Sequence, residues 1–205
     1  MAGLSLQTDA LVLLKQPPGD AFQSFTCFSA EHGHLVVLQR LPKKSAANVV
    51  LLDLFDEAAL VLDSSTQGRL WFVKEARLLA RATGIGRRYA ALQAASRFAA
   101  LVARNPVAPE SRAAVYALAT QLLAALGPAE RPDVAYFKAL YRFARDEGYP
   151  VKQQWFPSLS SADRAAVTAL LNRPLAGQAV PAPDVARLER HLTDYLRRET
   201  DLILT

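Results

Sequence analysis

The chain of 205 residues has 51% hydrophobic and 21% charged residues, a composition that excludes an intrinsically disordered protein. Its net charge of +5 indicates an acidic partner, and its single cysteine, Cys27, excludes an internal disulfide and a zinc site built from cysteines. The first twenty residues contain no apolar run long enough for a signal peptide or a membrane span, which predicts a cytoplasmic protein.

Strand patterns fill the first eighty residues. Residues 4–14 predict a first strand, and the proline- and glycine-containing residues 16–20 predict a turn. Residues 22–28 and 35–41 are two apolar runs of strand length. Between them lies Gly33, which can adopt the positive φ that a tight connection requires, so we expect a β-hairpin.

The next strands are separated by polar residues. The apolar runs 49–55 and 58–62 predict a pair of strands or one bulged strand, and residues 70–73 begin a last strand after a turn at residues 63–68. About five short strands with turns between them are typical of a small closed barrel such as an OB-fold.

From Lys74 onward the apolar residues recur at steps of three and four, which is the helical period. After a break at Thr83 and Gly84, further helices are expected over residues 89–102, 109–126, 134–147, 162–171 and 184–200. We therefore predict an α+β protein: an N-terminal OB-fold β-barrel, residues 1–80, followed by an all-helical domain, residues 81–205.

Several segments together resemble the RecO family of recombination mediators. These are the apolar strand at residues 10–13, the acidic Asp20, the hairpin segment 29–35, the run 51–55, and the helical segments 89–101 and 137–149, the last of which ends in Gly148 and Tyr149. Many members of that family carry a four-cysteine zinc module after the Gly-Tyr pair. The corresponding residues 152–157 contain no cysteine, so we expect no metal and no other cofactor.

The resemblance implies a function without bond-making chemistry. A RecO-like protein would act in DNA repair and recombination, bind single- and double-stranded DNA and promote strand annealing. It would work with RecR and with the C-terminal tail of single-stranded DNA-binding protein.

Basic residues close to the predicted domain junction are the candidate DNA contacts. Residues 1–83 contain eight basic and eight acidic residues, so a site there depends on local clustering. If residues 74–88 were helical, Lys74, Arg77, Arg81 and Arg88 would form a basic stripe on one side of the helix. The full candidate set is Arg40, Lys43, Lys44, Arg69, Lys74, Arg77, Arg81, Arg87 and Arg88. A solvated helix face is the simpler interpretation of the same charges.

Aromatic residues are the second requirement for binding single strands. Phe22, Phe25 and Phe28 cannot all face one side of a strand, so one or two are expected outside the core. For any single one of them core packing is the simpler interpretation, and Trp71 is expected within the core. In the helix 134–147, the residues Tyr136, Leu140 and Arg142 are the candidates for a groove that accepts a partner peptide. Packing in the centre of the helical domain is the alternative for them.

Enzymatic functions have little support in the sequence. The three histidines lack the spacing of a metal site, and residues 83–88 lack the Lys-Ser/Thr ending of a phosphate loop. Asp53, Asp56 and Glu57 are the remaining candidates for a Mg²⁺-dependent nuclease, although acidic residues that interrupt an apolar strand are the better explanation. The alternative to a DNA-binding mediator is therefore a non-enzymatic adaptor that binds proteins and has little affinity for DNA.

Overall fold

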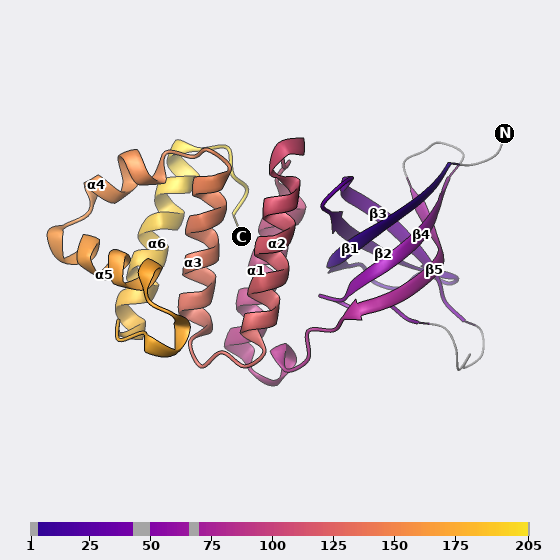
Figure 1. Ribbon diagram of the computed structural model, residues 1–205, viewed down its shortest axis with the longest axis horizontal. Coiled ribbons are helices and arrows are strands. Elements are labelled where there is room, and N and C mark those ends of the chain that lie inside the picture. The colour runs from indigo at the N-terminus through magenta and orange to yellow at the C-terminus, as the bar shows by residue number, and fades with distance from the viewer. Residues whose placement is uncertain (1–3, 43–49, 66–69, 205) are drawn as a thin grey trace. The chain divides into compact units, whose positions relative to one another are not determined.

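The computed structural model describes residues 4–42, 50–65 and 70–204. The chain forms two compact units. The barrel unit consists of Met1–Ala82 and Pro106–Thr120, and the helical unit consists of Thr83–Asn105 and Gln121–Thr205. Strands precede helices along the chain, so the predicted α+β class is confirmed (Figure 1).

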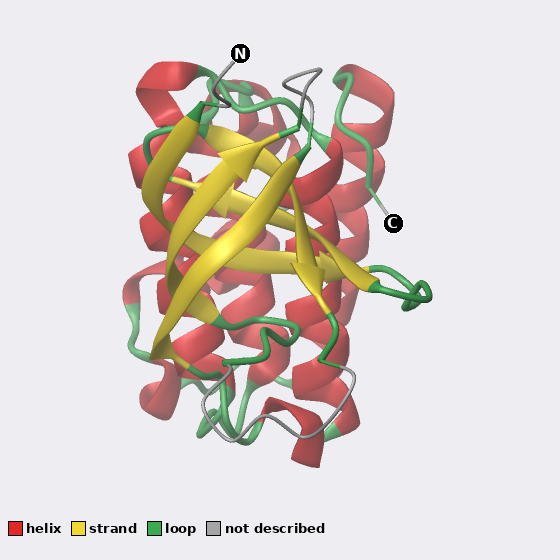
Figure 2. Ribbon diagram, turned by 90° about the vertical axis from the view of Figure 1, so that its right-hand side faces the viewer, coloured by secondary structure: helices red, strands yellow, loops and turns green. Residues whose placement is uncertain are grey.

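Within the described residues, the strands of the barrel unit close into a barrel (Figure 2). Their order around it is β1-β2-β3-β5-β4, and every neighbouring pair is antiparallel except the parallel pair β3–β5. The bounds are β1 Ser5–Lys15, β2 Phe22–Ser29, β3 Gly33–Arg40, β4 Glu57–Ser64 and β5 Trp71–Ala80.

The predicted hairpin is confirmed as β2 and β3. The two strands pair from Phe22 opposite Arg40 to Ser29 opposite Gly33. Gly33 has a φ of 69°, a conformation that other residues adopt at a cost, and a Cβ there would lie 2.9 Å from the Arg112 Nε atom. Both the backbone conformation and the close approach of the Arg112 side chain therefore favour glycine at this position.

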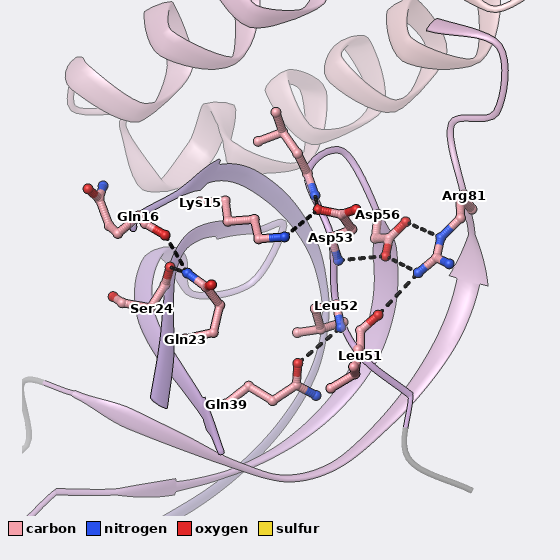
Figure 3. Close-up of polar contacts among 11 residues, drawn as sticks. Lys15, Gln16, Gln23, Ser24, Gln39, Leu51, Leu52, Asp53, Asp56 and Arg81 are labelled. Carbon is pink, nitrogen blue, oxygen red and sulfur yellow. Dashed lines mark hydrogen bonds and ion pairs between the residues drawn. The ribbon is translucent and has the colours of Figure 1, made fainter. Parts of the chain in front are cut away.

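The predicted strand at residues 49–55 is wrong for its described part, which is a loop that begins at Val50 (Figure 3). There, the buried side chain of Gln39 makes the hydrogen bonds to the backbone that a neighbouring strand would otherwise make. Its Nε2 atom donates to the Val50 carbonyl oxygen at 2.7 Å, and its Oε1 atom accepts from the Leu52 N–H at 3.0 Å. Because a side chain satisfies these backbone groups, this apolar run does not have to pair with a strand.

The predicted change to helix at Lys74 is also wrong, because β5 continues to Ala80. Its residues pair with β4, from Trp71 opposite Ser64 to Ala80 opposite Glu57. The pairing shifts register twice, so the alternation of faces is interrupted. The helical spacing of Ala76, Leu79 and Ala80 does not mark a buried helix face, because Leu79 and Ala80 are exposed on the strand.

The barrel core contains the only cysteine, and its thiol is expected to be unreactive in the folded protein. Cys27 is fully buried among Phe25, Leu35 and Val37, and burial raises the pKa of its thiol to about 12. Incubation with a chromogenic disulfide reagent at pH 8 should therefore release no chromophore until urea unfolds the barrel. Release of one equivalent at the rate of a free thiol in native buffer would contradict the buried position.

All five predicted helices are present in the structure, which also forms the short helix Phe156–Ser158 that was not predicted. Their bounds are α1 Tyr89–Arg104, α2 Arg112–Leu126, α3 Pro132–Asp146, α4 Phe156–Ser158, α5 Ser161–Asn172 and α6 Ala182–Glu199. Ser160 caps α5, because its Oγ atom accepts from the Asp163 N–H at 3.1 Å. None of the helices in the described part of the chain is long and apolar enough to cross a membrane.

One helical segment groups with the barrel. The expected helical domain, residues 81–205, includes Pro106–Thr120, whereas this segment belongs to the barrel unit. The Tyr116 hydroxyl of α2 donates to the Glu57 Oε1 atom of β4 at 2.8 Å. Burial, and then this hydrogen bond, raise the pKa of Tyr116. This bond joins residues 59 positions apart in the sequence, which local patterns do not reveal.

Candidate nucleic-acid interface

The predicted basic stripe is not formed. Lys74 and Arg77 belong to the strand β5, Arg81 follows it, and Arg88 lies in the other unit as the residue before α1. A helical stripe requires one continuous helix, whereas residues 74–88 contain the end of a strand and a short 3₁₀-helix, Ile85–Arg87. The predicted stripe is therefore wrong, and its residues have separate surroundings.

Arg81 is held by an internal carboxylate (Figure 3). Its Nε and Nη2 atoms donate to the two oxygens of Asp56 at 2.9 and 2.7 Å, and Nη2 also donates to the Leu51 carbonyl oxygen at 3.2 Å. The side chain of Asp56 is 1% exposed and that of Arg81 is 48% exposed. The hydrogen bond with Asp56 raises the pKa of Arg81. Arg81 therefore stabilises the loop that ends at Asp56.

Arg88 is held in the helical unit. Its guanidinium donates to the carbonyl oxygens of Leu126, Gly127 and Ala129, the last by a short hydrogen bond. The last carbonyl groups of a helix have no partner within the helix, so Arg88 satisfies the end of α2. The neighbouring Arg87 is exposed at the end of a short 3₁₀-helix.

The two basic residues of β5 lie near carboxylates. The Lys74 Nζ atom is 3.8 Å from an oxygen of Asp63, and both side chains are exposed. Arg77 lines a cavity of about 600 Å³ together with the carboxylates of Asp9, Glu31 and Glu75. Three carboxylates beside one guanidinium repel a phosphate backbone, so this cavity is a poor site for a nucleic acid.

A different part of the barrel has the composition that single-strand binding requires. The outward positions of β2 and β3 pair across the strands as Phe22 with Arg40, Ser24 with Leu38, and Thr26 with Val36. Phe72 of β5 lies beside Leu38. We name these seven residues the aromatic face: Phe22, Ser24, Thr26, Val36, Leu38, Arg40 and Phe72.

Two phenylalanine rings form the centre of the aromatic face. The rings of Phe22 and Phe72 meet edge to face, with centroids 5.7 Å apart. Phe22 is 37% exposed, whereas Phe25 and Phe28 are fully buried. The prediction that one or two of these three phenylalanines lie outside the core is therefore confirmed, with Phe22 as the exposed one.

The sequence did not indicate that Phe72 faces outward. Phe72 lies next to Trp71, which packs partly against the barrel core as expected. The alternation of a strand places neighbours on opposite faces, so a buried Trp71 is the signal that Phe72 faces outward. Only the pairing of β5 with β3 shows that it lies next to Phe22 and Leu38.

The charge of the aromatic face comes from Arg40. This residue is exposed at the end of β3, and none of the seven described residues is acidic. Lys43, Lys44 and Arg69, the remaining candidates, lie outside the described residues. Arg40 on β3 is therefore the cation of the aromatic face, whereas Arg77 on β5 lies with carboxylates at the cavity described above.

The predicted peptide groove on α3 is wrong for two of its three residues. Tyr136 is 4% exposed and Leu140 is fully buried, so both belong to the core of the helical unit. Arg142 is exposed. Because α3 packs against both α1 and α6, its apolar residues are covered by helices of the same unit.

No group of three or more metal-ligating side chains occurs within residues 4–42, 50–65 and 70–204. In the comparisons with known proteins, neither a protein-family model nor a curated protein matches the chain.

Proposed function

We propose that the protein binds single-stranded DNA on the aromatic face of its barrel and acts as a DNA repair and recombination mediator of the RecO type. The observation that carries the proposal is the aromatic face itself. It offers two adjoining phenylalanine rings, two hydroxyl side chains and an exposed arginine. The carboxylate of Asp63, opposite Phe72 on β4, lies 3.8 Å from the Lys74 Nζ atom. Stacking surfaces next to a cation are the two elements of single-strand recognition.

The strand order supports the proposal. We assign the barrel to the OB-fold, in which five strands form a Greek-key barrel and strands 2 and 3 bind oligonucleotides. The aromatic face lies on β2 and β3, with Phe72 contributed by β5. The RecO-like segments of the sequence give the same fold and function, and they are the basis for proposing RecR and single-stranded DNA-binding protein as partners.

The mechanism follows from how a base would contact this face. A base that stacks on Phe22 or Phe72 uses its π-face, and its hydrogen-bonding edge stays free for a second strand. Arg40 neutralises one phosphate and so lowers the repulsion between two strands. Annealing on this face requires no cofactor.

Replacing Phe22 and Phe72 together with alanine is expected to weaken binding of a dT oligonucleotide at least tenfold, because each stacked base contributes about 1–3 kcal/mol. Replacing Arg40 with alanine should reduce the slope of log K against log[salt] by about 0.7, the contribution of one phosphate contact with a single strand. Fluorescence anisotropy at several salt concentrations measures both quantities.

Tyr89→Ala is the matched control, because Tyr89 is 79% exposed but lies on α1, in the helical unit. It should leave affinity unchanged. Equal losses of affinity in Tyr89→Ala and in the double variant would show that the aromatic face is not the binding surface.

A non-enzymatic adaptor that binds proteins is the second candidate. It is favoured by the cations that the fold uses internally: Arg81 binds Asp56, and Arg88 binds the end of α2. In that case the apolar residues of the aromatic face would contact a protein. The same titration separates the two functions, because binding by a mediator falls steeply with salt, whereas an adaptor has little affinity for the oligonucleotide even at low salt.

A further inference from the structure

We propose that the helical unit contains a second binding site, for a phosphate group, in the cavity between α1 and α6. This site does not depend on the proposed function of the barrel. The cavity has a volume of about 370 Å³ and is lined by Arg97 of α1 and, from α6, by Ala186, Glu189, Arg190, Thr193, Asp194 and Arg197. We name it the α6 cavity.

Thr193 is the first indication of a ligand. It is 7% exposed, and its Oγ1 atom is buried without a hydrogen-bond partner among the described residues. A threonine within a helix commonly donates to the carbonyl group four residues earlier, as Thr168 does to Arg164 at 2.7 Å. The Thr193 hydroxyl makes no such bond. A buried hydroxyl without a partner is unfavourable, so an acceptor that entered the cavity would stabilise it.

The arginines give the chemistry of that acceptor. Arg190 and Arg197 lie three residues before and four residues after Thr193, and so on the same side of α6. Both are exposed, and neither forms an ion pair with the described residues. Two guanidinium groups on either side of a hydroxyl favour a ligand with several negatively charged oxygens.

Arg97 has a different role, because it is already bound. Its Nη1 atom is 2.6 Å from Glu189 Oε1, and its guanidinium lies 4.2 Å from the ring centroid of Tyr136. These two contacts hold the side chain in place and neutralise Glu189. The remaining charges of the α6 cavity are then two free arginines against Asp194, which favours an anion.

A phosphate fits the cavity better than the carboxylate of a peptide terminus. A phosphate group carries more negative charge than a carboxylate, and its tetrahedral oxygens can accept from Arg190, Arg197 and the Thr193 hydroxyl from different directions, whereas a carboxylate accepts mainly in one plane. The only apolar side chain in the lining is Ala186. An apolar peptide terminus would therefore find no wall to pack against.

The test uses the full-length, ¹⁵N-labelled protein and two probes, inorganic phosphate and a dT oligonucleotide. Either probe should shift the amide resonances of residues 190–197. Shifts with both identify a general phosphate site, and shifts with the oligonucleotide alone identify a site for a nucleic-acid backbone. The absence of a shift with both probes would overturn the proposal.

Three variants show which groups bind. The double variant Arg190→Gln/Arg197→Gln should abolish the shifts, and Thr193→Val should weaken binding about tenfold, the effect of one hydrogen bond to a charged group. Arg198→Gln is the matched control, because Arg198 is exposed on the same helix but does not line the cavity. Unchanged affinity in Thr193→Val together with unchanged affinity in the double variant would refute the site.

Thr193→Val also separates binding from a structural role. Valine has the same shape and removes the unsatisfied hydroxyl, so the urea midpoint should stay the same or rise. The Phe22→Ala/Phe72→Ala variant should keep its phosphate-induced shifts, because those residues lie in the barrel unit. Failure of DNA binding on the aromatic face and failure of the α6 cavity can therefore be told apart.

Discussion

Arg81→Ala is expected to destabilise the barrel unit by about 3 kcal/mol, because it leaves the carboxylate of Asp56 buried without its cation. Asp56 is 1% exposed and accepts two hydrogen bonds from Arg81 and a third from the Asp53 N–H at 2.8 Å. Breaking a buried pair costs about 3–5 kcal/mol. We take the lower end, because the side chain of Arg81 is 48% exposed and its loss admits water to the carboxylate.

The buried thiol of Cys27 measures this loss. If labelling follows transient opening of the barrel, a destabilisation of about 3 kcal/mol raises the labelling rate about 100-fold. Urea unfolding followed by the same labelling gives the change in the free energy of unfolding.

Arg77→Ala is the control for Arg81→Ala, because it removes the same side chain from the same part of the chain. Arg77 is exposed and forms no ion pair with the described residues, so its replacement should change stability by less than about 0.5 kcal/mol. Adding Asp56→Asn to Arg81→Ala should recover part of the loss, because a buried amide replaces a buried charge. If Arg81→Ala were as stable as Arg77→Ala, the ion pair would have no structural role.

Trp155→Ala is expected to destabilise the helical unit by about 3–5 kcal/mol, the usual cost of removing a large side chain from a core. Trp155 is fully buried, with its ring 6.5 Å from that of Phe137 and 6.0 Å from that of Tyr141. Its Nε1 atom donates to His191 Nδ1 at 2.9 Å, which joins the segment before α4 to α6. Alanine removes the packing and the hydrogen bond together.

Urea unfolding followed by circular dichroism at 222 nm reports on the helices and measures the effect. Trp155→Phe keeps an aromatic ring but loses the hydrogen bond, so it should cost less than Trp155→Ala. Tyr89→Ala, at an exposed aromatic position of α1, should lie within about 0.5 kcal/mol of the unsubstituted protein. A midpoint for Trp155→Ala equal to that of Tyr89→Ala would mean that this tryptophan is not part of the core.

Elements defined by neighbouring residues were predictable. The β2–β3 hairpin follows from Gly33, and the start of α5 follows from the Ser160 cap. The extent of β5 was not predictable, because its apolar spacing is helical and its ladder with β4 depends on residues far away in the sequence. The loop that begins at Val50 was missed for the same reason, since its partner is the side chain of Gln39.

The candidate site shows the same division. The sequence identified Arg40 as a candidate DNA contact, and it predicted that one or two of Phe22, Phe25 and Phe28 lie outside the core. It also grouped Arg77, Arg81 and Arg88 as one stripe, and the fold separates them into an acidic cavity, an ion pair with Asp56 and the end of α2. Charge alone does not say which cations are free, because a carboxylate or carbonyl partner can lie anywhere in the chain.

By itself, the sequence determined the α+β class, the hairpin, the helices and the single buried thiol, because these depend on local spacing, caps and composition. Only the tertiary structure decided which side chains meet: Phe22 with Phe72, Arg81 with Asp56, and Arg97 with Glu189. Such pairs form where strands or helices distant in the sequence pack together. The physical reason is that backbone ladders and core burial fix the register of an element, and the register then decides which side chains face outward.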